Sequence, residues 1–325
     1  MNRLQVTAWI SAHPEVREER IERPLVIVGL PRTGTTLLSY LLDCDPDRRS
    51  LMRWEAARSV PPPKATTFTV DPRIEDARTG SALLDAVNPA FKAIHYEAPD
   101  GPTECVTILA QDFKSLQWSC LANVPGYDAW LLSCDHASAY AYHRRELQLL
   151  QSRAPGRWTL KTPHHCLAFD KLFDQYADAR VVVLHRDPVR AVASLCSLVG
   201  SLAGTFTDAD HRASVAAHWP DMASAIVDGL STYRDRRGSD AFLDIGYQQL
   251  VDDPVGTVAR IYEWAGEDLT PETRARMQDY VARNPQDRHG RHTYALDDLL
   301  LDRATLEERF ADYRARYAIP HEPST

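Results

Sequence analysis

The sequence has little of what several classes of protein need. Its six cysteines include no Cys-x-x-Cys pair, and its histidines show no spacing such as His-Glu-x-x-His. We therefore expect no zinc knuckle, no dithiol redox motif and no metal site. An N-terminal run of basic and then apolar residues is missing, as is an apolar run long enough to span a bilayer. These absences favour a reduced, cytoplasmic protein without a membrane partner.

Lysine is also scarce, with five positions against abundant arginine, and the net charge is −8. An acidic protein of this kind is not expected to have nucleic acid as its main partner. An anionic ligand would need local basic groups to hold it against the overall charge. The oligomeric state stays open, because nothing in the composition decides it.

Short apolar segments of β-branched composition alternate with segments of helical periodicity. The expected strands are residues 24–29, 157–161, 179–185 and 241–246. The expected helices after three of them are residues 36–42, 189–199 and 253–265. Alternating strands and helices predict a parallel sheet with helices on both faces.

We predict one α/β domain over residues 1–325, because a chain of this length and 44% hydrophobic content can bury a large core. The expected architecture is a three-layer α/β/α fold with a central parallel sheet, like that of P-loop NTPases. Its core would comprise residues 24–54 and 156–270. Residues 55–155 would form a helical insertion that covers the site, and residues 284–318 a C-terminal basic loop and helix.

The motif Gly29-Leu-Pro-Arg-Thr-Gly34-Thr-Thr36 lies between the first expected strand and its helix. Its spacing matches the P-loop, whose backbone N–H groups and helix N-terminus bind phosphate. Thr35 stands where a P-loop has its lysine, and the basic residue is Arg32. This loop suits a phosphosulfate better than a Mg²⁺-bound triphosphate, which uses that lysine. A strand–helix turn without a ligand is the alternative.

A second basic group, Arg186, comes at the carboxyl end of the strand 179–185, where ligands bind in open α/β sheets. Ser194 lies on the same face of the following helix as the helix start. An arginine and a hydroxyl in these places could hold a second phosphate. Alternatively, Arg186 and Asp187 only cap the helix, and Ser194 packs.

With both motifs, the chain resembles the sulfotransferases that use 3′-phosphoadenosine-5′-phosphosulfate (PAPS), especially their bacterial branch. The resemblance runs from about residue 24 to 318. It implies that the first loop binds the 5′-phosphosulfate, through Pro31, Arg32, Thr33, Gly34, Thr35 and Thr36. It also implies that Arg186 and Ser194 bind the 3′-phosphate.

Two later segments extend this resemblance. Gly246-Tyr247 resembles the segment whose tyrosine contacts the adenine. Residues 287–294 resemble a basic loop that closes on the 3′-phosphate, which implies contacts from Arg288, His289 and Gly290.

The resemblance is less complete for the catalytic groups. Lys161 would stabilise the leaving oxygen together with Arg32. Cytosolic members place a catalytic histidine two residues after this lysine, but here Pro163 stands there and His164 follows. Other members use a glutamate after the first helix, where this sequence has Glu55. We therefore expect Glu55 as the general base and His164 as the second choice, although Glu55 could instead pair with a neighbouring arginine.

The resulting expectation is metal-free, in-line transfer of a sulfuryl group from PAPS to a hydroxyl of a small hydrophobic acceptor. The aromatic residues between positions 96 and 142 would suit such an acceptor, unless they belong to the core. Two alternatives remain: a P-loop kinase for a small metabolite, which would need a loop lysine and Mg²⁺, and a non-catalytic nucleotide-binding protein of the same fold.

Overall fold

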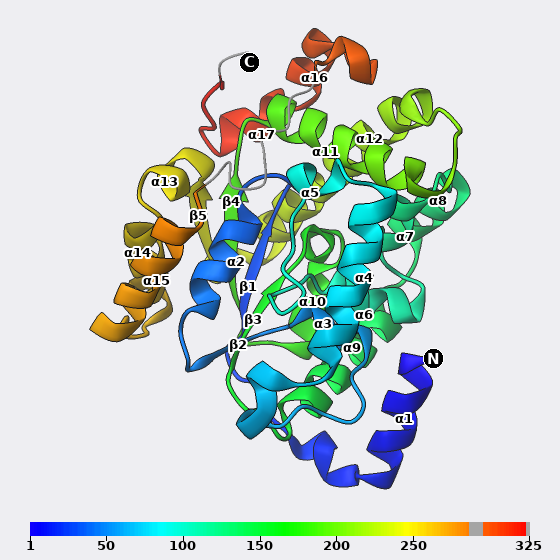
Figure 1. Ribbon diagram of the computed structural model, residues 1–325. Helices are drawn as coiled ribbons and strands as arrows, with labels where there is room; N and C mark the ends of the chain where they lie inside the picture. Colours follow the sequence, from blue (N-terminus) through cyan, green and yellow to red (C-terminus); the bar gives the residue numbers. More distant parts are fainter. Residues whose placement is uncertain (286–294, 323–325) are drawn as a thin grey trace.

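In the computed structural model, which describes residues 1–285 and 295–322, five parallel strands form one sheet (Figure 1). In the order of the sheet they are β2 (Arg48–Ser50), β3 (Arg157–Lys161), β1 (Leu25–Gly29), β4 (Arg180–His185) and β5 (Phe242–Gly246). Because β1 lies between β3 and β4, the segments that leave these three strands meet at the carboxyl edge of the sheet. This confirms the predicted parallel α/β fold.

Helices cover both faces of the sheet, as the alternation of side chains along its strands requires. In β1, Leu25 and Ile27 pack in a core with α2 (Thr35–Asp43) and α14 (Pro254–Ala265). Val26 and Val28 point to the other face and join a larger core. The helices of that core are α9 (Ala137–Gln151), α10 (Phe169–Gln175), α11 (Pro188–Ala203) and α12 (Arg212–Arg237).

Between β2 and β3 the chain forms helices, which lie along one side of the sheet (Figure 1). They are α3 (Arg53–Ala57), η2 (Ala65–Val70), α4 (Arg73–Val87), α5 (Phe91–Ile94), α6 (Val106–Leu109), η3 (Ala110–Asp112), α7 (Leu116–Leu121) and α8 (Pro125–Ser133), followed by α9. These helices build one wall of the cavity described below.

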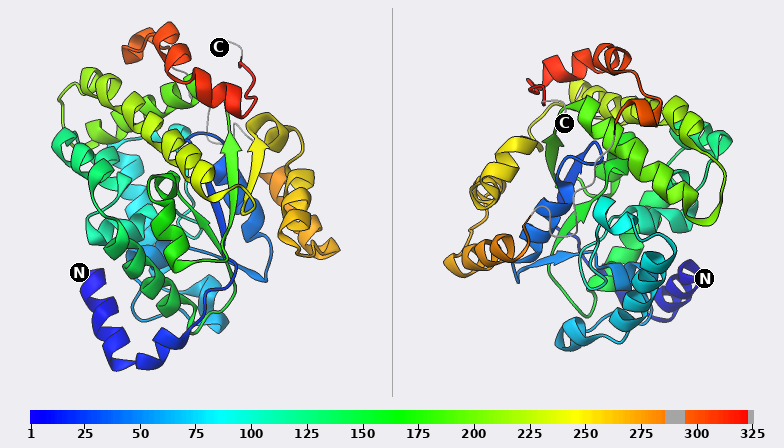
Figure 2. Two further views of the ribbon diagram at one scale, coloured as in Figure 1. Left: turned by 180° about the vertical axis from the view of Figure 1, so that it is seen from behind. Right: turned by 45° about the horizontal axis from the view of Figure 1, so that its top comes forward.

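The C-terminal helices α16 (Arg303–Arg309) and α17 (Ala311–Arg316) lie above the carboxyl end of β4 (Figure 2). His185, the last residue of β4, fixes α17 there. Its Nδ1 lies 2.8 Å from the hydroxyl of Tyr313, and its ring stacks on Tyr317 with 4.3 Å between the centroids. The last described residues are thus held next to the second predicted anion site.

The remaining elements are short or peripheral. They are α1 (Asn2–Ala12), η1 (Pro14–Glu18), η4 (Pro163–Leu167), η5 (Gly204–Phe206), α13 (Tyr247–Asp252), α15 (Pro271–Arg283) and η6 (Asp297–Leu299). In the part of the chain that the structure describes, no helix is both long and apolar enough to cross a bilayer.

Candidate functional site

The loop between β1 and α2 has the backbone of an anion-binding turn. Arg32 and Gly34 both have positive φ, at 73° and 90°. A Cβ atom on Gly34 would lie 3.2 Å from the ring of Tyr247, so that glycine permits both the turn and this close approach. The first N–H groups of α2, which starts at Thr35, have no acceptor within the helix. The loop can therefore present backbone donors to an anion.

Arg32, Arg186, Ser194 and Tyr247 come together beside this loop. The Nε of Arg32 donates to the Oγ of Ser194 at 3.0 Å. The Nη1 of Arg186 donates to the main-chain oxygen of Arg32 at 3.0 Å, and its guanidinium lies 4.1 Å above the ring of Tyr247. Two motifs separated by about 150 residues thus form one basic site at the carboxyl ends of β1 and β4.

A carboxylate from the C-terminal segment occupies the basic site. The Nε and Nη2 of Arg186 each donate to one oxygen of Glu322 at 2.8 Å, and the Nε of Arg190 lies 4.0 Å from that carboxylate. The backbone N–H of Glu322 donates to Asp187 at 2.8 Å. Such a paired contact is the geometry by which arginine binds carboxylates and phosphates. Arg186 is therefore positioned to bind an anionic group with two hydrogen bonds.

Lys161, the last residue of β3, lies beside the start of α2. Its Nζ is 3.4 Å from the Oγ1 of Thr36, 3.3 Å from Glu104 and 3.7 Å from Glu97. Burial alone would lower the pKa of Lys161, but the carboxylates of Glu104 and Glu97 outweigh that effect and raise it. Lys161 therefore keeps its positive charge beside the loop.

Glu55, the residue expected to act as the base, is held in a buried ion pair. Its side chain is fully buried, and its two oxygens accept hydrogen bonds from Arg49, both at 2.7 Å. One oxygen also accepts from the backbone N–H of Met52 at 3.0 Å. Glu55 does not line the cavity, so we assign it the role of holding β2 to α3 instead.

His164, the second predicted base, is fully buried as well. Its Nδ1 accepts a hydrogen bond from the backbone of Leu116 at 3.3 Å, and its Nε2 lies 3.3 Å from the Nδ1 of His136. Burial, and then the neighbouring His136, hold the pKa of His164 well below its usual value. Pro163 lines the cavity in its place. The other predicted contacts, Arg288, His289 and Gly290, lie outside the described residues.

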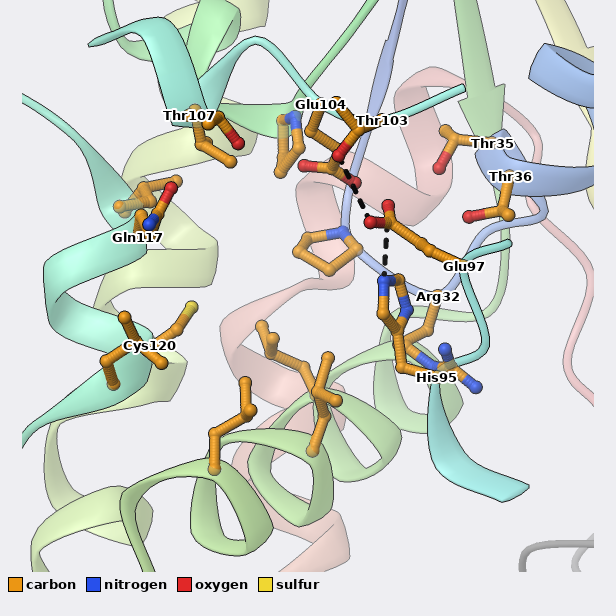
Figure 3. A pocket seen from close by; sticks show the side chains of 18 of the residues that line it. Arg32, Thr35, Thr36, His95, Glu97, Thr103, Glu104, Thr107, Gln117 and Cys120 are labelled. Atoms are coloured by element: carbon orange, nitrogen blue, oxygen red, sulfur yellow. Dashed lines mark hydrogen bonds and ion pairs between the residues drawn. The ribbon is translucent and has the colours of Figure 1, made fainter. Parts of the chain in front are cut away.

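A cavity of about 540 Å³ connects the basic site to the helices between β2 and β3. Its polar end contains hydroxyl and ionisable side chains, namely those of Arg32, Thr35, Thr36, His95, Glu97, Glu104 and Arg186. Its apolar end is lined by Leu84, Phe91, Val106, Leu116, Leu121, Leu198, Leu202 and Trp219. Figure 3 shows His95, Glu97, Arg32, Thr35 and Thr36 on one side of this cavity and Cys120 on the other. The cavity therefore joins the basic site to a wall of apolar side chains.

Three residues that line the cavity, His95, Glu97 and Glu104, were not predicted from the sequence. These residues follow no periodic pattern and no motif, and they belong to a helical segment whose position over the sheet only the fold reveals. A His-x-Glu sequence in a segment expected to cover the site was the one available signal.

The fold is that of a P-loop-like α/β protein, with a basic site beside the loop that follows β1. Residues 24–271 match the model of the sulfotransferase family, and the chain belongs to this family. It is an enzyme that transfers a sulfuryl group. A comparison with curated proteins gave no match.

Two crystal structures of mycobacterial enzymes resemble the chain over nearly its whole length. Sulfotransferase STF9 from Mycobacterium avium is 39% identical with a TM-score of 0.90, and the match covers 99% of this chain and 85% of STF9. Sulfotransferase STF1 from Mycobacterium tuberculosis H37Rv is 33% identical with a TM-score of 0.84, and the match covers 96% of this chain and 82% of STF1. These similarities confirm the predicted family and its bacterial branch.

Proposed function

We propose that this sulfotransferase uses PAPS as its donor and transfers the sulfuryl group to a hydroxyl of a small apolar molecule. The observation that carries this proposal is the single cavity that joins the basic site to an apolar chamber. Such a cavity can hold a nucleotide with two anionic groups at one end and an uncharged acceptor at the other.

The donor has an anion at each end of its ribose, and the structure has basic groups for both. The backbone of residues 31–36 and the side chain of Arg32 would bind the 5′-phosphosulfate. Arg186 would bind the 3′-phosphate with the paired hydrogen bonds that it now makes to Glu322, and Ser194 would assist it. Tyr247 would contact the adenine. Contacts from Arg288, His289 and Gly290 stay a prediction from the sequence.

Transfer then needs little more than alignment and charge stabilisation. The acceptor oxygen attacks sulfur in line with the bridging oxygen, and the S–O bond to the 5′-phosphate breaks. Negative charge develops on that bridging oxygen. Arg32 in the loop and Lys161 beside it would stabilise this charge, which gives the protein its own cations for a reaction that we propose to be metal-free.

The apolar chamber supports an uncharged, hydrophobic acceptor. Leu84, Phe91, Leu198 and Leu202 come from three helices and leave few polar partners for a substrate at that end. A hydroxyl is then the group that reaches the polar end, where Lys161 and the loop lie.

Measurement of labelled sulfate transfer from PAPS to a panel of hydroxyl compounds tests this proposal. Leu121→Glu places a charge in the cavity wall, whereas Leu132→Glu places one on an exposed helix surface outside it. We expect Leu121→Glu to raise the KM for apolar acceptors about tenfold, corresponding to about 1.4 kcal/mol, and to leave nucleotide binding unchanged. Equal behaviour of the two variants would contradict the location of the acceptor.

A further inference from the structure

Neither base that the sequence predicted lines the cavity, but the cavity wall contains an imidazole. His95 follows α5 and lines the same cavity as Arg32, Thr35 and Thr36. Its Nε2 lies 3.5 Å from Oε1 of Glu97, the contact drawn as a dashed line in Figure 3. Among the described residues that line the cavity, His95 is the only histidine.

Glu97 is itself held firmly in place. Its Oε2 accepts a hydrogen bond from the Oγ1 of Thr103 at 3.1 Å, and its main-chain oxygen accepts one from Arg53, also at 3.1 Å. Burial alone would raise the pKa of Glu97, but the hydrogen bond from His95 and the charges of Lys161 and Arg53 lower it to about 2. Glu97 is therefore a permanent carboxylate, weakly basic but well suited to orient a neighbour.

The contact with Glu97 sets the tautomer of His95. A carboxylate can only accept, so the Nε2 of a neutral His95 carries the hydrogen that faces it. The lone pair then belongs to Nδ1, the nitrogen that is not engaged by Glu97. A carboxylate that orients an imidazole in this way leaves the lone pair of the other ring nitrogen to accept a proton.

The other ionisable groups of the polar end are less suited to accept a proton. Lys161 stays protonated, because Glu104 and Glu97 raise its pKa. Glu104 is paired with the ammonium group of Lys161 at 3.3 Å. Burial raises the pKa of the Cys120 thiol to about 12, so this group stays neutral and unreactive.

We propose that His95 is the general base of the transfer and that Glu97 is its positioning residue, an inference that rests on the proposed function. Nδ1 of His95 takes the proton of the acceptor hydroxyl as the acceptor oxygen bonds to sulfur. The S–O bond to the 5′-phosphate breaks, and its electron pair stays on the phosphate oxygen of the departing adenosine 3′,5′-bisphosphate. The imidazolium beside Glu97 afterwards releases its proton to water.

A comparison of two acceptors distinguishes this role from a structural one. Benzyl alcohol needs a base during transfer, whereas 4-nitrophenol is acidic enough to react as its anion. We expect His95→Gln to lower kcat with benzyl alcohol by about 10²–10⁴-fold and to lower it far less with 4-nitrophenol. Glu97→Gln should show a smaller loss with the same preference, and its KM should hardly change. His218→Gln, on the exposed face of α12, is the matched control and should resemble the wild type.

Two further measurements test nucleotide binding and the role of His95 separately. Adenosine 3′,5′-bisphosphate should bind His95→Gln and wild type equally in calorimetry. Failure of the wild type to bind it would overturn the proposed function and this inference with it. Normal binding with an undiminished rate for benzyl alcohol in His95→Gln would overturn the assignment of the base alone. Nitrogen-15 NMR should show the Nε2–H tautomer of His95 in the wild type, and the Nδ1–H tautomer would contradict the inference.

Discussion

Glu55 and Arg49 form an ion pair whose members are almost completely withdrawn from water. Arg49 also donates to the main-chain oxygens of Ala154 and Leu150, and its guanidinium lies 4.4 Å above the ring of Trp158. This pair therefore connects β2 to the end of α9 and to β3. Its loss should affect stability, because a buried charge without its partner is costly.

We expect Glu55→Gln to lower the free energy of unfolding by about 3 kcal/mol and to leave kcat per folded molecule close to that of the wild type. Urea unfolding and active-site titration with adenosine 3′,5′-bisphosphate give the two quantities separately. Glu75→Gln, on the exposed surface of α4, is the control. A variant that is as stable as the wild type but inactive would return Glu55 to the role of base.

Among single residues, the sequence predicted which basic side chains lie together, whereas the two expected bases are buried in other contacts. Arg32, Arg186 and Ser194 follow from motifs whose spacing reports on a turn and a helix face, and the structure brings them together. The burial of Glu55 and His164 depends on which side chains surround them, which spacing does not report. The position of His95 depends on how a long helical segment folds back over the sheet.

The described segment after α17 contacts the basic site directly. Glu322 binds Arg186 through both carboxylate oxygens, in the position that we assign to the 3′-phosphate. The nucleotide must displace this carboxylate in order to reach Arg186. The two side chains are 16% and 22% exposed, so the contact is worth less than a fully buried pair would be.

We therefore expect Glu322→Gln to bind adenosine 3′,5′-bisphosphate about fivefold more tightly than the wild type, corresponding to about 1 kcal/mol. Calorimetric titration measures the change directly. Glu308→Gln removes a charge from the exposed surface of α16 and controls for the general effect of charge. Unchanged or weaker binding by Glu322→Gln would contradict the competition.

The sequence predicted the strands that consist mainly of apolar, β-branched residues. The segments 24–29, 157–161, 179–185 and 241–246 became β1, β3, β4 and β5 with boundaries within a residue. β2 was not predicted, because Arg48, Arg49 and Ser50 have the composition of a surface turn. They form a buried strand only because partners distant in sequence, such as Tyr262 and Glu267, bind Arg48.

For the molecule as a whole, a buried carboxyl group connects the N-terminal helix to the helices beside the sheet. Glu146 on α9 is fully buried and accepts hydrogen bonds from Asn2 and Gln111, both at 3.2 Å, and from Ser59. Burial raises the pKa of Glu146 to about 7, although the hydrogen bonds from Ser59 and Tyr142 oppose the rise. The folded protein therefore keeps this group protonated at pH values where the unfolded chain ionises it.

This raised pKa makes stability depend on pH in a defined direction. Below the pKa of 4.5 in the unfolded chain, Glu146 is protonated in both states and carries no penalty. As the pH rises from 4.5 to about 7, only the unfolded chain ionises, and folding loses about 3 kcal/mol. Glu146→Gln, a neutral isostere, should lose less stability over this range in urea unfolding. The surface control Glu18→Gln should show the same pH dependence of the free energy of unfolding as the wild type. If Glu146→Gln also shows that dependence, the raised pKa of Glu146 is contradicted.

We propose that the basic site at the carboxyl ends of β1 and β4 binds the nucleotide of a sulfuryl donor. Calorimetric titration of adenosine 3′,5′-bisphosphate, and separately of ATP with Mg²⁺, into wild type, Arg186→Ala and the surface control Arg237→Ala tests it most directly. We predict micromolar binding of the bisphosphate to the wild type and the control, at least about 30-fold weaker binding to Arg186→Ala, and no comparable binding of ATP. Equal binding of the bisphosphate to Arg186→Ala, or a preference for ATP with Mg²⁺, would contradict the account.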